Sequence, residues 1–322
     1  MITSINITNC KFDAKRYSSQ TEFNKFYKDF NLDGIELMFI NGDMTIPSVM
    51  SKAQINGIHI NCLNSWIDLW FNNKNALIEE YGSVEECKKQ TGCINREDLI
   101  EKYQKELDMA QKLGVKYVVF HVSDVTLSES IHYNQRYTDE IIISACADLI
   151  NALTLNHNYS FDFLCENLWW GGMNFRDPKI TKKMMDLINY PKKGIMLDTG
   201  HLMHLNNDLS NQEEAVSYIL KILDQHKNLI SYIKGIHLHQ SITGKYVKDC
   251  LSNPIKLSGN YIDKMNSVMM YIYQIDTHKA FETVSAKKII EKVKPEYLTH
   301  EFISSSLDEH YNLLKTQINA IK

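Results

Sequence analysis

Short apolar runs alternate with longer amphipathic segments along the whole chain. Residues 195–197 form an unbroken apolar run that leads directly into Asp198. A run without polar alternation is typical of a strand buried on both faces, as in a parallel sheet. Residues 21–31 instead repeat phenylalanine at helical spacing, which predicts an amphipathic helix. The chain therefore reads as an α/β sequence from one end to the other.

The same pattern predicts eight strands, each followed by a helical segment or a long connection. Strands are expected at 4–10, 35–39, 57–62, 117–121, 161–166, 194–198, 232–239 and 297–302, and helices at 21–31, 97–113, 137–157, 177–188, 211–229, 261–274, 284–293 and 307–321. Such alternation implies parallel strands joined by right-handed crossovers. It predicts a single (β/α)8 TIM barrel over residues 1–322. A doubly wound open sheet is the alternative, but the Gly-rich phosphate turn usual after its first strand is absent.

Two connections are much longer than the others. One is an insertion at about 63–95 and the other runs from about 240 to 283. Long connections in a compact domain are usually functional or disordered. Because the insertion carries Trp66, Trp70 and Phe71, we expect it to act as a lid.

Composition narrows the class of protein. The chain has 322 residues, of which 44% are hydrophobic, and this is enough for a large core. No apolar run reaches the roughly 18 residues of a membrane span, and residues 1–6 do not resemble a signal peptide. The 7 scattered cysteines are typical of reduced thiols, so a cytoplasmic location is expected. A net charge of −4 disfavours non-specific nucleic-acid binding, although a local basic groove stays open.

Histidines and acids gather at the predicted strand ends, where chemistry is placed in a barrel. These residues are His59, His121, Glu166, Asp198, His201, His237, His300 and Glu301, and the connection after the seventh strand adds Asp276 and His278. Imidazole nitrogen and carboxylate oxygen are the ligands of zinc, and they also suit iron. The pattern predicts a divalent-metal site, with zinc favoured and manganese, magnesium or iron possible. A hydrogen-bonded core or rim role is the alternative for any single histidine, and capping of the following turn is the alternative for Asp198.

At these motifs the chain resembles the xylose isomerase-like TIM-barrel superfamily, which contains endonuclease IV-type enzymes and sugar isomerases and epimerases. The resemblance covers the third to the eighth strand and rests on Cys-Glu-Asn, Leu-Asp-Thr-Gly-His, His-Leu-His-Gln-Ser and Thr-His-Glu-Phe. It implies one divalent metal held by Glu166, Asp198, His237 and Glu301, as in the sugar epimerases.

The endonuclease IV branch of this superfamily holds three zinc ions with five further ligands. Their counterparts here are His59, His121, His201, Asp276 and His278. The Asp-x-His pair discriminates best, because mononuclear epimerases of this group generally lack it. Three features of the endonuclease branch are missing. Cys62 stands where that branch has a DNA-probing Tyr, residues 39–44 contain no Arg or Lys, and residues 279–284 replace its Gly-rich segment. The substrate is therefore expected to be smaller than duplex DNA.

Aromatic residues also cluster just beyond the predicted strand ends. Trp66 follows the third strand, and Trp169 and Trp170 follow the fifth. Flat rings in such places can cover a sugar or stack on a base, which predicts a substrate-binding role. The alternative is that they pack the two loops together. His239, two residues after His237, is a further candidate for contact with substrate.

Two functions compete at this point. The favoured one is a multinuclear metal hydrolase that cuts a phosphoester of a small polar or phosphorylated substrate, with Glu166 bridging two or three zinc ions. It is favoured because Asp276 and His278 have no clear task in a one-metal enzyme. The alternative is a mononuclear sugar isomerase or epimerase in which Glu166 and Glu301 act as the acid/base pair. A barrel that only binds metal or ligand, and an iron oxidase, also remain open.

Overall fold

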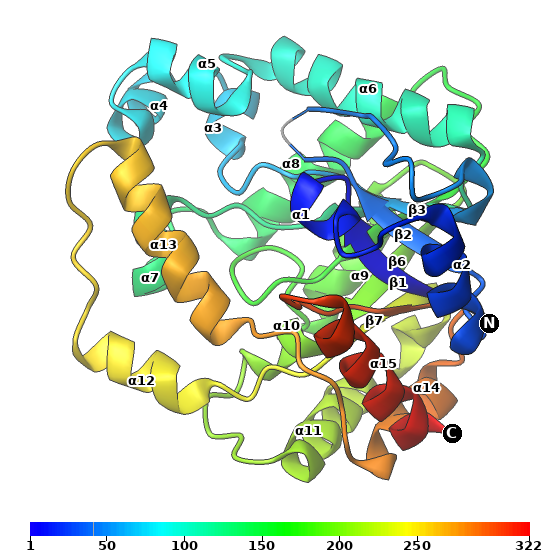
Figure 1. Cartoon of the computed structure of the whole chain (residues 1–322). Coiled ribbons are helices and arrows are strands. Elements are labelled where there is room, and N and C mark those ends of the chain that lie inside the picture. Colours follow the sequence, from blue (N-terminus) through cyan, green and yellow to red (C-terminus); the bar gives the residue numbers. More distant parts are fainter. Residues whose placement is uncertain (41) are drawn as a thin grey trace.

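A closed parallel β-barrel forms the centre of the molecule. The computed structural model describes residues 1–40 and 42–322, and within these residues eight strands pair in chain order, with β1 also pairing with β8 (Figure 1). The strands are β1 Ile2–Thr8, β2 Gly34–Met38, β3 Ile55–His59, β4 Tyr117–His121, β5 Asp162–Glu166, β6 Lys193–Asp198, β7 Ile233–Leu238 and β8 Tyr297–His300. The predicted (β/α)8 TIM barrel is confirmed.

Helices surround the barrel and also fill its long connections. They are α1 Lys11–Ala14, α2 Gln20–Asp29, α3 Ile67–Trp70, α4 Lys74–Tyr81, α5 Val84–Thr91, α6 Arg96–Leu113, α7 Leu127–His132, α8 Asp139–Thr154, α9 Pro178–Leu187, α10 Thr199–Met203, α11 Gln212–Gln225, α12 Gly244–Ser252, α13 Tyr261–Ile275, α14 Lys287–Val293 and α15 Leu307–Ile321. The sequence pattern missed α1, α3, α4, α5, α7, α10 and α12. Most of these have only one or two turns, too few for a helical repeat to show. None of the helices in the described residues is long and apolar enough to cross a membrane.

Apolar side chains fill the barrel interior near the amino ends of the strands. Tyr117, Val119, Leu164, Met196 and Tyr297 form one buried cluster there. A second, much larger core lies between the strands and the surrounding helices. Because the lower interior is packed, the polar residues at the carboxyl ends of the strands form a separate layer above it.

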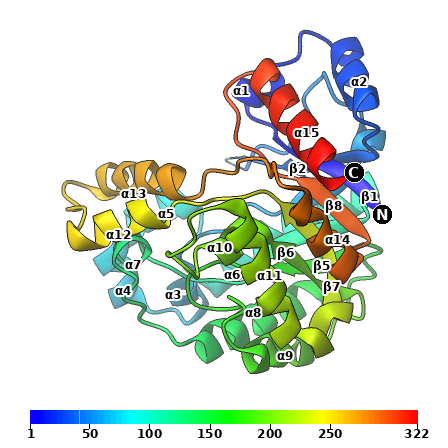
Figure 2. The same ribbon diagram turned by 90° about the horizontal axis from the view of Figure 1, so that it is seen from below.

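The two long connections meet beside the carboxyl rim. Both views place α4, α7, α12 and α13 on the same side of the barrel (Figures 1 and 2). The rings of Tyr81 on α4 and Tyr261 on α13 lie 4.6 Å apart. A small hydrophobic cluster, distinct from the barrel core, joins α7, α12 and α13 to Trp169 and Trp170. The predicted lid role of residues 63–95 and the single-domain boundaries stay predictions.

A buried ionic network ties the 63–95 insertion to the segment after β4. Arg136 Nη1 lies 2.8 Å from Asp68 Oδ2, and Arg136 Nε lies 3.3 Å from Glu129 Oε1. Asp124 Oδ1 accepts the backbone N–H groups of Trp66 and Ile67 at 2.7 and 2.9 Å, and so satisfies the start of α3. Three buried carboxylates thus converge on one guanidinium.

This network makes stability depend on pH. Burial raises the pKa of Asp124 to about 7, and the hydrogen bonds from Ile67 and Trp66 lower it only in part. Since the ordinary Asp pKa is about 3.9, the folded state favours the protonated form. The stability contributed by this group is therefore full below about pH 4 and is lost as the pH rises through about 7. We expect Asp124→Asn to gain stability relative to the natural protein over that range, as measured by urea unfolding at several pH values.

Asp148, which is exposed on α8, supplies the matched control. Asp148→Asn should leave the pH dependence of unfolding unchanged. A stability difference between Asp124→Asn and the natural protein that stays constant with pH would contradict the prediction.

Candidate metal centre

The structure brings the nine predicted ligand residues together at the carboxyl rim. They form three groups. In each group every residue offers one nitrogen or oxygen atom, and these atoms all lie within 4.8 Å of one another. The first group is His59, His121 and Glu166; the second group is Glu166, Asp198, His237 and Glu301; the third group is His201, Asp276 and His278. Strand ends β3 to β7 supply five of the nine residues. His201 lies just beyond β6, Glu301 just beyond β8, and Asp276 and His278 in the segment that follows α13.

Glu166 belongs to two groups because its two oxygens face different imidazoles. Its Oε2 lies 3.0 Å from His59 Nε2 and 3.4 Å from His121 Nε2. Its Oε1 lies 3.2 Å from His237 Nδ1 and 3.4 Å from His201 Nδ1. A carboxylate that presents one oxygen to each of two neighbouring groups can bridge two cations.

In the second group, Asp198 both caps a helix and contributes an oxygen to the cluster. Its Oδ1 accepts the His201 N–H at 2.6 Å and so caps α10. Its Oδ2 lies 3.8 Å from His237 Nδ1, which in turn lies 3.0 Å from Glu301 Oε2. The capping alternative considered for Asp198 is thus observed, and it leaves one oxygen directed at the cluster.

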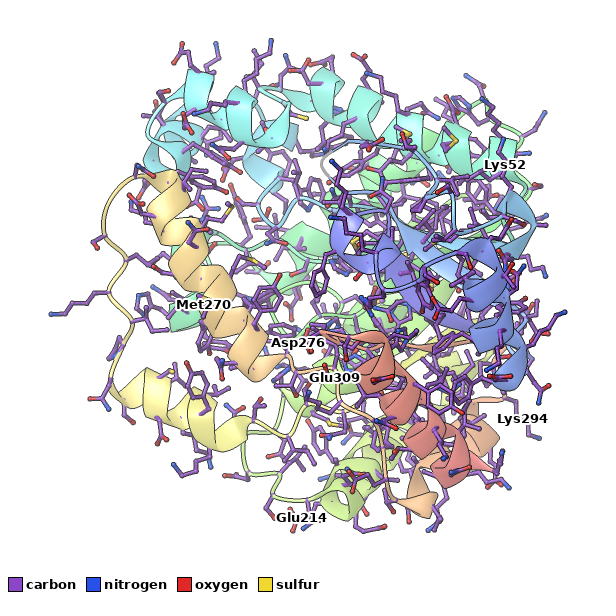
Figure 3. All side chains as sticks on the ribbon, viewed as in Figure 1. Lys52, Glu214, Met270, Asp276, Lys294 and Glu309 are labelled. Carbon is purple, nitrogen blue, oxygen red and sulfur yellow. The ribbon has the colours of Figure 1, made fainter. Side chains whose placement is uncertain are left out.

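The third group depends on the connection that follows α13. Asp276, labelled at the end of α13 in Figure 3, places Oδ2 2.9 Å from His278 Nε2 and 3.4 Å from His201 Nε2. Ser241 donates its hydroxyl to the other Asp276 oxygen at 3.2 Å. His278 has a φ of +46°, a left-handed conformation that non-glycine residues rarely adopt. Such backbone strain persists only where the surroundings impose it.

Charges within the cluster shift several pKa values strongly. Burial lowers the pKa of His201, but the carboxylates of Asp198 and Asp276 outweigh it and raise the value to about 10. Burial also lowers the pKa of His278, while Asp276 and Glu301 raise it to about 9. Burial raises the pKa of Glu166, but His237 and His121 hold it well below the ordinary value. The buried carboxylates therefore stabilise positive charge inside the barrel, and bound divalent cations would supply such charge.

Some buried nitrogen and oxygen atoms of the cluster make no hydrogen bond, and this also fits a site for cations. Within the described residues, His278 Nδ1 is buried and makes no hydrogen bond, and Glu301 Oε2 is buried with no hydrogen bond but lies 3.0 Å from His237 Nδ1. Buried polar groups rarely stay unpaired unless an ion, a water or a functional role accounts for them. The side chain of His121 is 25% exposed and is the most accessible of the nine, since the other eight are at most 11% exposed. Among the nine residues, solvent therefore reaches His121 most readily.

Two buried residues beside the cluster were not predicted. Glu36 on β2 forms a further close group with His59 and His237. His204, one turn after His201 on the same side of α10, places Nε2 3.7 Å from Asp276 Oδ1. The signal for Glu36 was an acid between Ile35 and Leu37 in the middle of an apolar strand.

The predicted substrate-binding residues lie mostly inside the protein. Trp66 is 1% exposed and donates Nε1–H to Ser123 O, and Trp170 donates to Ser130 O. Both contact neighbouring loops, and their substrate-binding role stays a prediction. Trp169 lies closest to the cluster, with its ring centre 5.1 Å from that of His201. His239 is fully buried, with Nε2 2.8 Å from Asp198 Oδ2, so it faces a predicted ligand rather than open space.

Two other sequence features lie at the edge of the site. His300 faces Gln317 and lies outside the three groups. Cys62, at the position of the missing Tyr, accepts the His121 N–H at 3.4 Å. Residues 39–44, which lack Arg and Lys, include Asn41, which lies outside the described residues.

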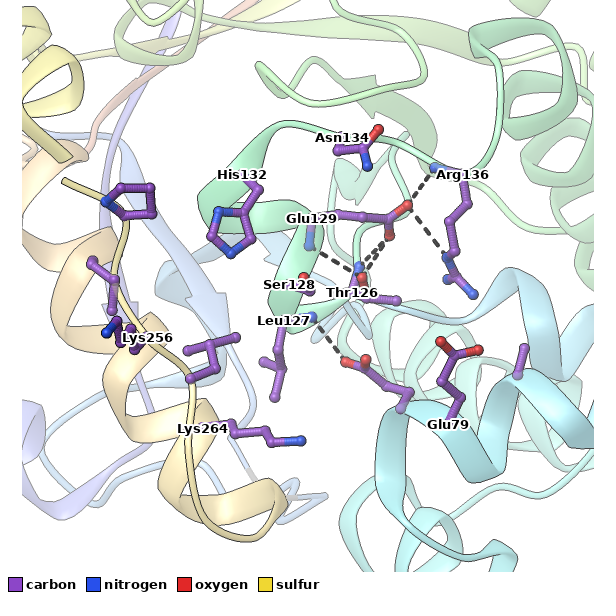
Figure 4. A pocket seen from close by; sticks show the side chains of 15 residues that line it. Glu79, Thr126, Leu127, Ser128, Glu129, His132, Asn134, Arg136, Lys256 and Lys264 are labelled. Atoms are coloured by element: carbon purple, nitrogen blue, oxygen red, sulfur yellow. Dashed lines mark hydrogen bonds and ion pairs between the residues drawn. The ribbon is translucent and has the colours of Figure 1, made fainter. Parts of the chain in front are cut away.

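A cavity of about 930 Å³ lies beside the rim, between the two long connections. Glu79 of α4, Leu127 and His132 of α7, and Lys256 and Lys264 line it (Figure 4). Glu129 also faces it and bonds Thr126 and Arg136 with its two oxygens. Its lining contains none of the nine ligand residues. The cavity is thus separate from the metal-ligand groups.

The fold and the site together define a (β/α)8 barrel with a histidine and carboxylate cluster at its carboxyl rim. Residues 94–252 match the sequence model of the family described as Xylose isomerase-like TIM barrel. The expected resemblance to this superfamily is confirmed. A search of curated proteins found no match.

Solved structures with the same fold span the whole chain. They include endonuclease IV from Thermus thermophilus, with 13% identity, 100% of this chain and 99% of that chain covered, and a TM-score of 0.51. The 3-keto-D-glucoside 4-epimerase from E. coli has 10% identity, 99% coverage of both chains and a TM-score of 0.54. A putative xylose isomerase from Rhodospirillum rubrum has 13% identity, 98% coverage of both chains and a TM-score of 0.56. At these identities the likeness concerns the fold alone.

Proposed function

We propose that this protein is a metal-dependent hydrolase that cuts a phosphoester at a multinuclear, zinc-favouring site. The observation that carries the proposal is the position of Glu166, whose two oxygens face two separate groups of imidazoles. A mononuclear enzyme needs no such bridge. The third group, His201, Asp276 and His278, adds a complete set of zinc-type ligands beside the other two.

In this proposal Glu166, His59 and His121 have different roles. Zinc supplies Lewis acidity, which activates water and offsets charge on a phosphoryl group. Glu166 sets the spacing between the first and second groups and orients the attacking water. The hydrogen bond between His59 Nδ1 and Ile60 O, at 3.1 Å, directs His59 Nε2 to the cluster. Partial exposure of His121 leaves the first group as the entry side for the substrate.

The substrate we propose is a small phosphorylated or otherwise polar molecule. Eight of the nine residues are deeply buried, and Cys62 and residues 39–44 lack the Tyr and the basic residue with which the endonuclease branch engages DNA. A net charge of −4 also gives no general attraction to a nucleic-acid backbone. The first probe for activity is therefore a chromogenic phosphodiester such as bis(p-nitrophenyl) phosphate.

Metal counting tests the proposal directly. We expect two or three zinc ions per chain after gentle purification, measured by inductively coupled plasma analysis. His278→Ala should remove one ion, because it takes a ligand from the third group, and should lower phosphodiesterase activity by about 10²-fold or more. One ion per chain in the natural protein would refute the multinuclear reading.

His226 supplies a matched control for this variant. It is also buried, but it faces Thr181 and Ile222 far from the cluster. His226→Ala should cost stability and leave zinc content unchanged. If both variants lost the same amount of zinc, the loss would reflect damage to the fold.

A sugar isomerase or epimerase with one divalent metal is the second candidate. The observation that favours it is the second group, which offers four ligands by itself and includes both Glu166 and Glu301. In that case these two carboxylates would exchange a proton beside the carbonyl of the substrate. One ion per chain, together with deuterium uptake from solvent into a sugar, would establish this function instead.

A further inference from the structure

A buried carboxylate below the metal-ligand layer makes contacts with three strands across the barrel. Glu36 on β2 is 1% exposed. Its Oε2 accepts the hydroxyl hydrogen bonds of Tyr117 at 2.8 Å and Thr299 at 3.0 Å. The same carboxylate lies 3.0 to 3.1 Å from His237 Nε2 on β7. Since β2 and β7 are not neighbours in the sheet, this contact spans the barrel interior.

The surroundings are shaped for this arrangement. A Cβ atom on Gly57 would come within 2.3 Å of the Tyr117 ring, so a larger residue on β3 would displace the tyrosine. The space left by Gly57 lets the Tyr117 hydroxyl reach Glu36. Burying a carboxylate in a barrel is costly unless several donors satisfy it. Here two hydroxyl groups and one imidazole do so.

The contact between Glu36 and His237 Nε2 leaves Nδ1 as the His237 nitrogen available to ligate a cation. Glu36 already accepts two hydroxyl hydrogen bonds, and His237 Nε2 lies where its N–H can donate to the same carboxylate. The other nitrogen, Nδ1, faces oxygens of two predicted ligands, so a cation held between those oxygens would take its lone pair. Nδ1 lies 3.2 Å from Glu166 Oε1 and 3.0 Å from Glu301 Oε2. The ring cannot rotate without losing the contact on one side or the other.

We propose that Glu36 is a positioning residue that holds His237 in the Nε2–H form, so that Nδ1 ligates a cation in the second group. The inference rests on the proposed metal site and adds a residue that the nine predicted ligands do not include. A carboxylate behind a ligating imidazole fixes its orientation and raises its basicity, and loss of such a partner typically weakens metal binding about 10- to 100-fold.

Glu36→Gln tests this role, because the side chain keeps its shape and loses its charge. We expect one zinc ion to bind about 10- to 100-fold more weakly, as measured by competition with a chromophoric chelator. Glu106→Gln is the control, since Glu106 is also a buried carboxylate and accepts only the Asn61 N–H at 3.1 Å. Glu106→Gln should bind zinc as tightly as the natural protein does.

A spectroscopic measurement covers the case in which Glu36→Gln does not fold. In the zinc-loaded natural protein, nitrogen NMR of labelled histidine should show His237 protonated at Nε2. Protonation at Nδ1, or unchanged zinc affinity in a folded Glu36→Gln variant, would overturn the inference while the proposed function stood. A natural protein that binds no zinc would instead remove the proposed function, and this inference with it.

Discussion

Glu166→Gln is expected to remove the ion of the first group and to reduce phosphodiesterase activity by at least about 10²-fold. The amide of glutamine offers one oxygen and one NH₂ group, so it cannot present an oxygen to both the first and the second group. The first group would keep only His59 and His121. The third group does not include Glu166, and the second group keeps Asp198, His237 and Glu301, so the ions of these two groups should remain. Plasma analysis of the purified variant, with the activity assay beside it, measures both effects.

The number of zinc ions that each variant retains shows whether Glu166 acts as a bridge. Glu106→Gln, the same change in a buried carboxylate outside the cluster, should retain all ions and full activity. A Glu166→Gln variant that kept three ions would show that Glu166 does not bridge. A variant that lost every ion would show that the three groups do not bind independently.

Arg136→Leu is expected to destabilise the folded protein by about 3 kcal/mol, the lower end of the range for breaking a buried ion pair. The change leaves Asp68, Asp124 and Glu129 buried without their common cation. A third of the Arg136 side chain is exposed, so solvent already screens part of the interaction. Urea unfolding at pH 7 measures the loss, and the melting temperature should fall by roughly 4 °C.

The pH dependence separates lost charge from lost packing. Burial raises the pKa of Asp124 and the Arg136 charge lowers it in part. Without Arg136 the folded state should therefore bind a proton on Asp124 more readily, so the destabilisation should shrink as the pH falls towards about 4. Arg176 is exposed, and within the described residues its side chain donates to Trp169 O alone, at 3.3 Å. Arg176→Leu should cost less than about 1 kcal/mol at any pH. A loss for Arg136→Leu that did not change with pH would point to packing alone.

Much of the candidate site was readable from local sequence. His59, His121 and Glu166 end short apolar runs, and parallel strands place such ends on one rim. The prediction that Asp276 and His278 join them rested on the resemblance to the endonuclease branch. The structure places both beside His201, although the register of a long connection cannot be derived from periodicity.

Other contacts could not be predicted from the chain alone. Trp66 and Trp170 were expected at the surface of a pocket, because their positions just beyond strand ends were the only information available. Trp170 packs in one hydrophobic cluster with residues of α7 and α13, and Trp66 belongs to the main core, so both are buried by distant parts of the sequence. Glu36 looked like an isolated acid in a strand, and its partner His237 lies 201 residues away.

The sequence by itself determined the barrel and the kinds of side chain at its rim. A period-two or unbroken apolar run and a helical repeat are local properties, and eight alternations of them leave few topologies. Only the tertiary structure decided which atoms face each other. It places one Glu166 oxygen beside His59 and the other beside His237, and it places Glu36 beside Nε2 of His237. Barrel closure brings strands separated by most of the chain within hydrogen-bond distance, and no local pattern encodes that approach.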